Sequence, residues 1–463
     1  MIFPTVQFAI FFPLVLGLSW ALMPRPALWK PFMLVASYAF YGAAGLEFCL
    51  LLAGITIGNQ IAARWIVRAQ SGAARKRILA AAVVLDLGVL GVFKYYGFFA
   101  QEINGVLETF GLGLSAPLVA LAIPLGVSFF TFQAISYVVD VYRGTIEPGT
   151  LLDVALYLGF FPHVVAGPIV RAKEFLPQLA SPRNPRDVPV GAAVGLIALG
   201  LIKKVAIADY LAREVVDPVF AVPEAYSAPD VLLASYAYAA QIFCDFSGYT
   251  DIAIGVALLC GFVFPQNFNR PYGATGFQDF WRRWHMTLSR FLRDFLYIPL
   301  GGSRGGKLFT ARNLMLTMIL GGLWHGAAWT FLLWGTLHGA GLVVERLLSG
   351  RVRSPAWLRW FVTFHLVVLG WVLFRSPSLG IAGDVLGQLT DFGPATLWTV
   401  PAVLAVVVVV GLQLIPERPI EAARLRLEGL NPAILGLGLA VVVMLVAATV
   451  PSQGVPPFIY FQF

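Results

Sequence analysis

The sequence predicts an all-α, polytopic membrane protein with about ten to twelve transmembrane or re-entrant helices. The first observation is composition: of 463 residues, 59% are hydrophobic and 12% are charged, whereas soluble domains carry about 25% charged residues. The second is that apolar residues gather in long runs, and roughly 20 of them span a bilayer. The third is that basic clusters and acidic loops alternate between these runs.

Long apolar runs define the expected spans. In chain order they are Phe8–Met23, Phe32–Gly45, Phe48–Trp65, Ile78–Tyr96, Leu118–Val141, Gly191–Tyr210, Pro229–Val263, Trp357–Phe374, Trp398–Ile415 and Ile434–Val450. The N-terminus lacks a basic region and a small-residue cleavage site, so we expect Thr5–Met23 to be a retained span and not a removed signal peptide.

Charge placement predicts the topology. Arginine and lysine clusters follow the first, third and fifth spans, so the positive-inside rule puts the N-terminus outside and Arg64–Arg77 in the cytoplasm. Further loops expected in the cytoplasm are Arg171–Arg186, Arg346–Arg359 and Glu417–Arg426. We assign the net charge of +8 to basic residues in these cytoplasmic loops, where they lie near anionic lipid. Nucleic-acid binding is not expected, because no basic soluble domain exists that could carry it.

The cysteines indicate neither a disulfide nor a metal site. Cys49, Cys244 and Cys260 all lie in apolar runs and form no CxxC pair, so we expect small core residues and no bound metal.

A proline-rich run near the middle of the chain predicts irregular backbone. Leu152–Val170 contains Pro162, Gly167 and Pro168, which break a helix, so we expect a kinked or re-entrant segment. Irregular backbone survives at membrane depth only when it is buried in protein or lines a wet cavity. His163 in this run is therefore either a cavity-lining residue or a capping and interface histidine.

Charged residues also interrupt two expected spans. Lys203 and Lys204 fit a helix near the interface that extends its charges toward water. Asp245 and Asp251 are costly within apolar sequence unless they are paired or hydrated, which leaves a structural and a functional role open.

The most informative stretch is Phe277–Gly339, which begins with basic and aromatic residues. From Arg270 to Arg312 there are eight Arg or Lys residues and only two acidic residues, Asp279 and Asp294. Helical periodicity places on one face Phe280, Trp281, Trp284, Thr287, Leu288, Phe291, Leu292 and Phe295, and on the other Arg282, Arg283, Ser289, Arg290, Arg293 and Asp294. We expect one amphipathic helix in the cytoplasmic interface, with His285 on the border between its faces.

The cations of this helix have two interpretations. They anchor the protein to anionic lipid, or they contact the phosphates of a soluble donor such as coenzyme A, since Arg and Lys suit phosphate recognition. The loop Gly301–Lys307 could add backbone donors, although it lacks the P-loop spacing.

A histidine inside an apolar segment follows. Leu314–Leu348 is too long for one span, so it must bend or form a helix pair. Its small-residue pairs, Gly322 with Gly326 and Gly335 with Gly339, would let two helices approach closely. His325 lies in the first pair.

His325 is the candidate catalytic base. Burial disfavours the cationic form of an imidazole, and a neutral imidazole accepts a proton from a hydroxyl, which suits acyl transfer. On these grounds alone, His325 could equally be a hydrogen-bond donor that pairs two helices or part of a proton path. His338 lies about 220° further round a straight helix, so the two histidines should not share a face.

These residues resemble the membrane-bound O-acyltransferase family, in particular its bacterial members that acetylate exported polysaccharides such as alginate. The resemblance covers nearly the whole chain. Its motifs are Phe161–His163 with Ala166–Pro168, Asp245–Tyr249, Asn267–Tyr272, Phe280–His285, Gly322–Gly326 and Phe458–Phe463.

The resemblance implies a fold, a reaction and a site. His325 matches the family's essential histidine, deep in a central tunnel across the membrane, and His285 matches a second histidine nearby. Acetyl-CoA would enter from the cytoplasm as the donor substrate, with no bound cofactor, and the acetyl group would leave toward a periplasmic partner and an exported polysaccharide. The localisation implied is the bacterial inner membrane. Donor- or substrate-binding residues expected from the motifs are Arg282, Arg283, Trp324, Asn267, Asn269 and Ser289.

We therefore expect an O-acetyltransferase in a single membrane domain, with N-terminal helices (1–150), a catalytic core (151–348) and C-terminal helices (349–463). The alternative is a proton-coupled transporter of a lipid or saccharide, with His163, Asp245 and His325 as a relay. A scaffold for an export complex is the third interpretation.

Overall fold

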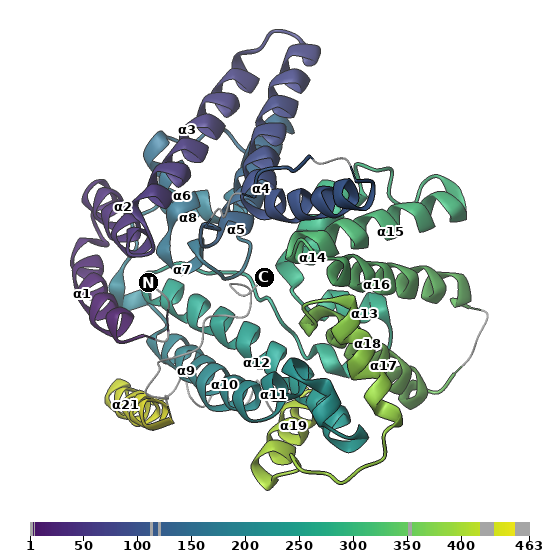
Figure 1. Ribbon diagram of the computed structural model, residues 1–463. Coiled ribbons are helices and arrows are strands. Elements are labelled where there is room, and N and C mark those ends of the chain that lie inside the picture. Colours follow the sequence, from purple (N-terminus) through teal and green to yellow (C-terminus); the bar gives the residue numbers. More distant parts are fainter. Residues whose placement is uncertain are drawn as a thin grey trace. The chain divides into compact units, whose positions relative to one another are not determined.

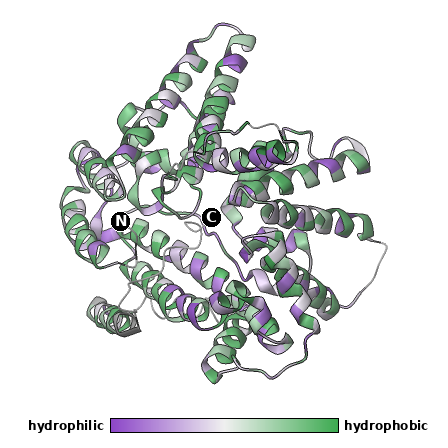
Figure 2. Cartoon of the chain, viewed as in Figure 1, coloured by the Kyte–Doolittle hydropathy of each residue, from purple (hydrophilic) through white to green (hydrophobic). Residues whose placement is uncertain are grey.

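The computed structural model describes residues 3, 5–111, 114–118, 122–350, 354–416 and 430–449. Every regular element in these ranges is helical, which confirms the predicted fold class. Six helices are long and apolar enough to cross a membrane, and four shorter helices are also apolar. Hydrophobic residues predominate on the long helices, with hydrophilic residues interspersed among them, as expected where a helix faces lipid or protein and not water (Figure 2).

The chain forms two compact units. The first contains Met1–Val188 and Val256–Phe264, and the second contains Pro189–Gly255 and Pro265–Phe463. Helix α12 (Ala228–Leu259) contributes to both, because its last turn belongs to the first unit.

The first unit is built on eight α-helices among its described residues (Figure 1). These are α1 (Val6–Leu22), α2 (Pro26–Gly42), α3 (Leu46–Arg68), α4 (Gly72–Thr109), α5 (Val127–Tyr142), α6 (Leu151–Gly159), α7 (Phe161–Val164) and α8 (Ala172–Ala180). The span expected from Leu118 begins later, because Pro124 and the left-handed Gly126 (φ 74°) precede α5. The predicted break at Phe160–Pro168 is confirmed, since α6 and α7 are separate helices.

The second unit holds the remaining α-helices. They are α9 (Val190–Leu201), α10 (Asp209–Leu211), α11 (Asp217–Ala221), most of α12, α13 (Phe277–Arg283), α14 (Met286–Leu292), α15 (Gly306–His325), α16 (Trp329–Leu348), α17 (Ala356–Arg375), α18 (Leu379–Gly387), α19 (Val400–Leu412) and α21 (Pro432–Thr449). Helices with π geometry, Ile202–Ala208, Ala212–Val216 and Arg293–Tyr297, interrupt or extend these helices.

Close backbone contact joins α9 to α12. A Cβ on Gly200 would lie 2.5 Å from the carbonyl oxygen of Gly248, and one on Gly255 would lie 2.6 Å from that of Ala193. Only glycine permits such an approach. It lets side chains that follow α9 reach the carboxylates of α12.

The lysines after α9 are paired inside the protein, which corrects the prediction that they extend toward water. Lys204 is 2% exposed, and its Nζ lies 2.6 Å from Asp209 Oδ1 and 2.5 Å from Asp245 Oδ1. Lys203 pairs with Asp251 at 2.7 Å. The carboxylates are therefore compensated by lysines, because an unpaired charge at membrane depth would be costly.

Helices α15 and α16 form the predicted pair. They lie side by side as an antiparallel hairpin, and the chain turns at Gly326–Ala328 (Figure 1). A Cβ on Gly322 would collide with the carbonyl oxygen of Phe331, and one on Gly335 with that of Met318. The small residues are thus needed for this hairpin, as the sequence suggested.

Two sequence predictions lie outside the described residues. They are the loop Glu417–Arg426 and the aromatic segment Phe458–Phe463.

Candidate active site

His325 is the last residue of α15 and is 3% exposed. Its ring centroid lies 4.9 Å from that of Trp324, 5.1 Å from Trp334 and 5.2 Å from Phe374. The carbonyl end of a helix carries partial negative charge, worth about 0.3–1 kcal/mol toward a nearby cation. This position therefore stabilises positive charge that develops on the His325 ring when it takes up a proton.

His285 lies at a break in the helix that the sequence predicted to be continuous. Helix α13 ends at Arg283, Trp284 is extended (φ −98°, ψ 131°), and α14 starts at Met286. His285 itself is left-handed, with φ 40° and ψ 55°. A non-glycine residue in this region costs about 1–3 kcal/mol, and such strain gathers at functional sites.

Asn267 holds this strained turn. Its Oδ1 lies 3.2 Å from Thr287 N, 2.9 Å from Thr287 Oγ1 and 3.1 Å from His285 Nδ1. Its backbone carbonyl accepts a further bond from Met286 N at 2.9 Å. The bond from a backbone N–H identifies Oδ1 as the acceptor, so His285 Nδ1 is the donor.

The protonation state of His285 follows from this bond and from burial. The side chain is 0% exposed, and burial lowers its pKa to about 3. It is therefore a neutral imidazole at pH 7, with its proton on Nδ1 and a lone pair on Nε2.

Trp324 lies between the two histidines. Its ring centroid is 4.9 Å from that of His325 and 6.1 Å from that of His285. His285 and His325 are 40 positions apart in the sequence, and both contact this one tryptophan. We predicted that these two histidines act together. Trp324 is 4% exposed, so this cluster is inside the protein.

The apolar face predicted for Phe280–Phe295 is packed in protein and not at a membrane surface. Phe280 stacks on Trp284 at 5.7 Å, Trp281 contacts Trp334 at 5.7 Å, and Trp284 contacts Trp371 at 4.8 Å. Helical periodicity therefore identified the buried residues correctly. It could not show that they pack against residues of α16 and α17 and not against lipid, because no local pattern identifies these partners.

The other expected binding residues surround this cluster. Arg282 is exposed, whereas Arg283 is half-buried and its Nε lies 2.7 Å from Asp279 Oδ1. Ser289 donates from its hydroxyl to the carbonyl of Trp284 at 3.3 Å. Asn269 donates from its backbone N–H to the carbonyl of Arg283 at 2.9 Å.

His338 joins the site, although the sequence argument separated it from His325. The spacing of residues on one straight helix does not apply here, because the turn at Gly326–Ala328 puts the two histidines on facing helices. His338 is 0% exposed, and its ring lies 4.6 Å from that of Trp334, which also contacts His325. A WGxxHG pattern in the sequence was the available signal.

Two residues of the transporter alternative each have a partner within their own unit. His163 belongs to the first unit, where its Nε2 lies 2.7 Å from the carbonyl oxygen of Tyr157. Asp245 pairs with Lys204 in the second unit. Each therefore has a structural partner of its own.

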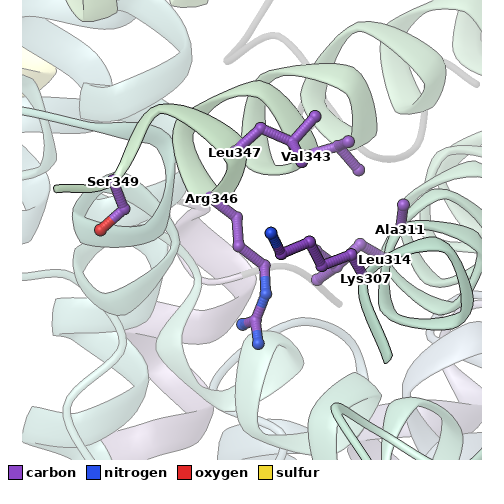
Figure 3. Close-up of a pocket in the computed structure, with 7 residues that line it drawn as sticks. All are labelled: Lys307, Ala311, Leu314, Val343, Arg346, Leu347 and Ser349. Carbon is purple, nitrogen blue, oxygen red and sulfur yellow. The ribbon is translucent and has the colours of Figure 1, made fainter. Parts of the chain in front are cut away.

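A pocket of about 230 Å³ lies at the opposite end of the hairpin from His325. Lys307 of α15 and Arg346 of α16 extend toward it from facing helices (Figure 3). Its other lining residues are Ala311, Leu314, Val343, Leu347 and Ser349. Lys307 precedes His325 by 18 residues, or about 27 Å of helix, so this basic recess is separate from the histidine cluster.

Residues 127–372 match the membrane-bound O-acyltransferase family. This range includes all three clustered histidines, and the chain belongs to that family. It is therefore a membrane-bound O-acyltransferase, which decides against the transporter and the scaffold.

The names of individual relatives refer to three different acceptors. The chain is 42% identical over 391 residues to the probable alginate O-acetylase AlgI of Pseudomonas aeruginosa, covering 83% of this chain and 74% of the relative. It is 38% identical over 406 residues to the peptidoglycan O-acetyltransferase of Helicobacter pylori, covering 80% and 75%. It is 28% identical over 357 residues to the teichoic acid D-alanyltransferase of Streptococcus thermophilus, covering 67% and 86%.

Proposed function

We propose that this protein transfers an acetyl group from cytoplasmic acetyl-CoA across the bacterial inner membrane toward an exported polysaccharide, by way of a periplasmic partner. The observation that carries the proposal is the buried cluster in which Trp324 contacts both His325 and His285. Relatives named as O-acetylases support an acetyl group and a cell-envelope saccharide.

In the proposed reaction His325 is the general base. It takes the proton of a hydroxyl group as the oxygen attacks the thioester carbonyl; the C–O bond forms, the C–S bond breaks, and the thiolate sulfur receives a proton. The end of α15 stabilises the imidazolium between these steps. A positioned base contributes about 10²–10⁴-fold to the rate.

His285 assists as a neutral group of fixed orientation. Asn267 holds its Nδ1–H, so the Nε2 lone pair can accept a hydrogen bond from a reacting hydroxyl. Arg282 and Arg283 are proposed to attract the phosphates of the donor, as cations at the edge of this cluster.

The test uses purified protein in lipid vesicles with radiolabelled acetyl-CoA and a saccharide acceptor, with and without candidate periplasmic partners. His325→Ala should lower transfer at least about 100-fold while the protein still inserts and folds. The matched control is His365→Ala, which removes a half-buried histidine of α17 that bonds to Tyr236 at 2.9 Å. Full activity of His325→Ala would refute the assigned role.

A further inference from the structure

The second buried histidine of the hairpin has no hydrogen-bond partner in the described part of the chain. Neither Nδ1 nor Nε2 of His338 is bonded there, although the side chain is 0% exposed. The indole N–H groups of Trp334 and Trp281, which contact His338, also lack partners among the described residues. An unmet buried polar group costs about 1–3 kcal/mol, and several together indicate a bound polar molecule.

The surroundings of His338 otherwise hold it firmly. Phe277 and Phe280 of α13 lie 5.4 and 5.8 Å from its ring, and Trp334 lies 4.6 Å away. On α17, a Cβ added to Gly370 would lie 3.1 Å from Nε2. The imidazole is thus fixed by aromatic packing and by a glycine that leaves room for it, and not by hydrogen bonds.

Its place along the hairpin is specific. Gly335 approaches Met318 and Gly339 approaches Met315, so His338 lies level with residues seven to ten positions before His325. At 1.5 Å per residue, its backbone is displaced by about 10–15 Å toward the Lys307 end of α15, while the two imidazole rings lie closer together than that because each contacts Trp334. Trp334 contacts both imidazoles and bridges this interval.

The proposed reaction, on which this step rests, moves a proton as well as an acetyl group. The hydroxyl on the acceptor side loses a proton to His325, and the thiolate on the donor side gains one. If the reactants approach from opposite sides, that proton travels in the direction opposite to the acetyl group. His338 is the next titratable group along the hairpin from His325 toward the end expected in the cytoplasm.

We propose that His338 and the indole N–H of Trp334 bind ordered water, and that through this water His338 relays the proton from His325 to the leaving thiolate. His338 acts on the substrate through water and is a positioning and relay residue. It takes a proton from water on its unprotonated ring nitrogen and returns a proton to water from that same nitrogen, so its tautomer is unchanged after each turnover.

The test compares His338→Gln with His338→Phe in the full-length protein. Glutamine keeps a donor and an acceptor but does not titrate, whereas phenylalanine keeps only the packing. We expect both variants to fold, and His338→Gln to lower kcat at least about tenfold with the KM for acetyl-CoA unchanged and an increased solvent deuterium isotope effect. If His338→Gln retains the wild-type kcat, the relay is refuted.

Two further measurements keep the inference testable if these variants fail to fold. Gly370→Ala leaves the imidazole in place but crowds Nε2, and it should lower kcat with no loss of acetyl-CoA affinity. A density map of the wild-type protein should show water within hydrogen-bond distance of His338. A map without that water overturns the inference. Absence of acetyl transfer by the wild-type protein would instead contradict the proposed function, while the map would still decide whether His338 binds water.

Discussion

Replacing Asn267 by alanine should disable the active site without touching either candidate catalytic histidine. The substitution removes the Oδ1 atom that accepts from Thr287 N, Thr287 Oγ1 and His285 Nδ1. Each such bond contributes about 0.5–1.5 kcal/mol, so the three together contribute about 3 kcal/mol. These three bonds then no longer offset the strain of the left-handed His285.

We expect Asn267→Ala to lower kcat by about 10–100-fold, because about 1.4–2.8 kcal/mol of lost orientation at His285 corresponds to that range. The assay is acetyl transfer in vesicles, with thermal unfolding measured in parallel. Asn313→Ala is the matched control: Asn313 is fully buried and donates to the carbonyl of Gly302 at 2.9 Å, so it should cost stability but not activity. Equal kcat values for the two variants would refute the reasoning.

Three further perturbations follow from the contacts of the second unit. Lys204→Met removes the ammonium that pairs with the buried carboxylate of Asp245, and thermal unfolding should show a loss of about 3–5 kcal/mol. Gly335→Leu should prevent α15 and α16 from packing and abolish accumulation of folded protein on size-exclusion chromatography, whereas Gly411→Ala, with no atom near its added Cβ, should not. Arg282→Gln should raise the KM for acetyl-CoA several-fold at low salt with kcat unchanged, and the effect should shrink as salt screens the charge.

The fold class and the hairpin could be predicted from the sequence because each depends on a sum over many residues. Hydrophobic content and run length are sufficient for helices in a membrane. The length of Leu314–Leu348 required a pair, and its glycines indicated close packing. Likewise, a 3.6-residue period identified the buried face of Phe280–Phe295.

The interruptions of that pattern could not be predicted, because their causes lie elsewhere in the chain. The break at His285 depends on Asn267, 18 residues earlier. The burial of Lys204 depends on Asp245, on a helix that glycines bring close. The position of His338 depends on where the hairpin turns, and helical periodicity carries no information about a residue beyond a turn.

The most direct test of the central claim is transfer between the two sides of a membrane. Vesicles containing oriented wild-type or His325→Ala protein would enclose radiolabelled acetyl-CoA, with the saccharide acceptor and any required periplasmic partner outside. The account predicts that the wild-type protein esterifies the outside acceptor and releases an equal amount of free coenzyme A inside, and that His325→Ala does neither. Esterification by His325→Ala at the wild-type rate would contradict it.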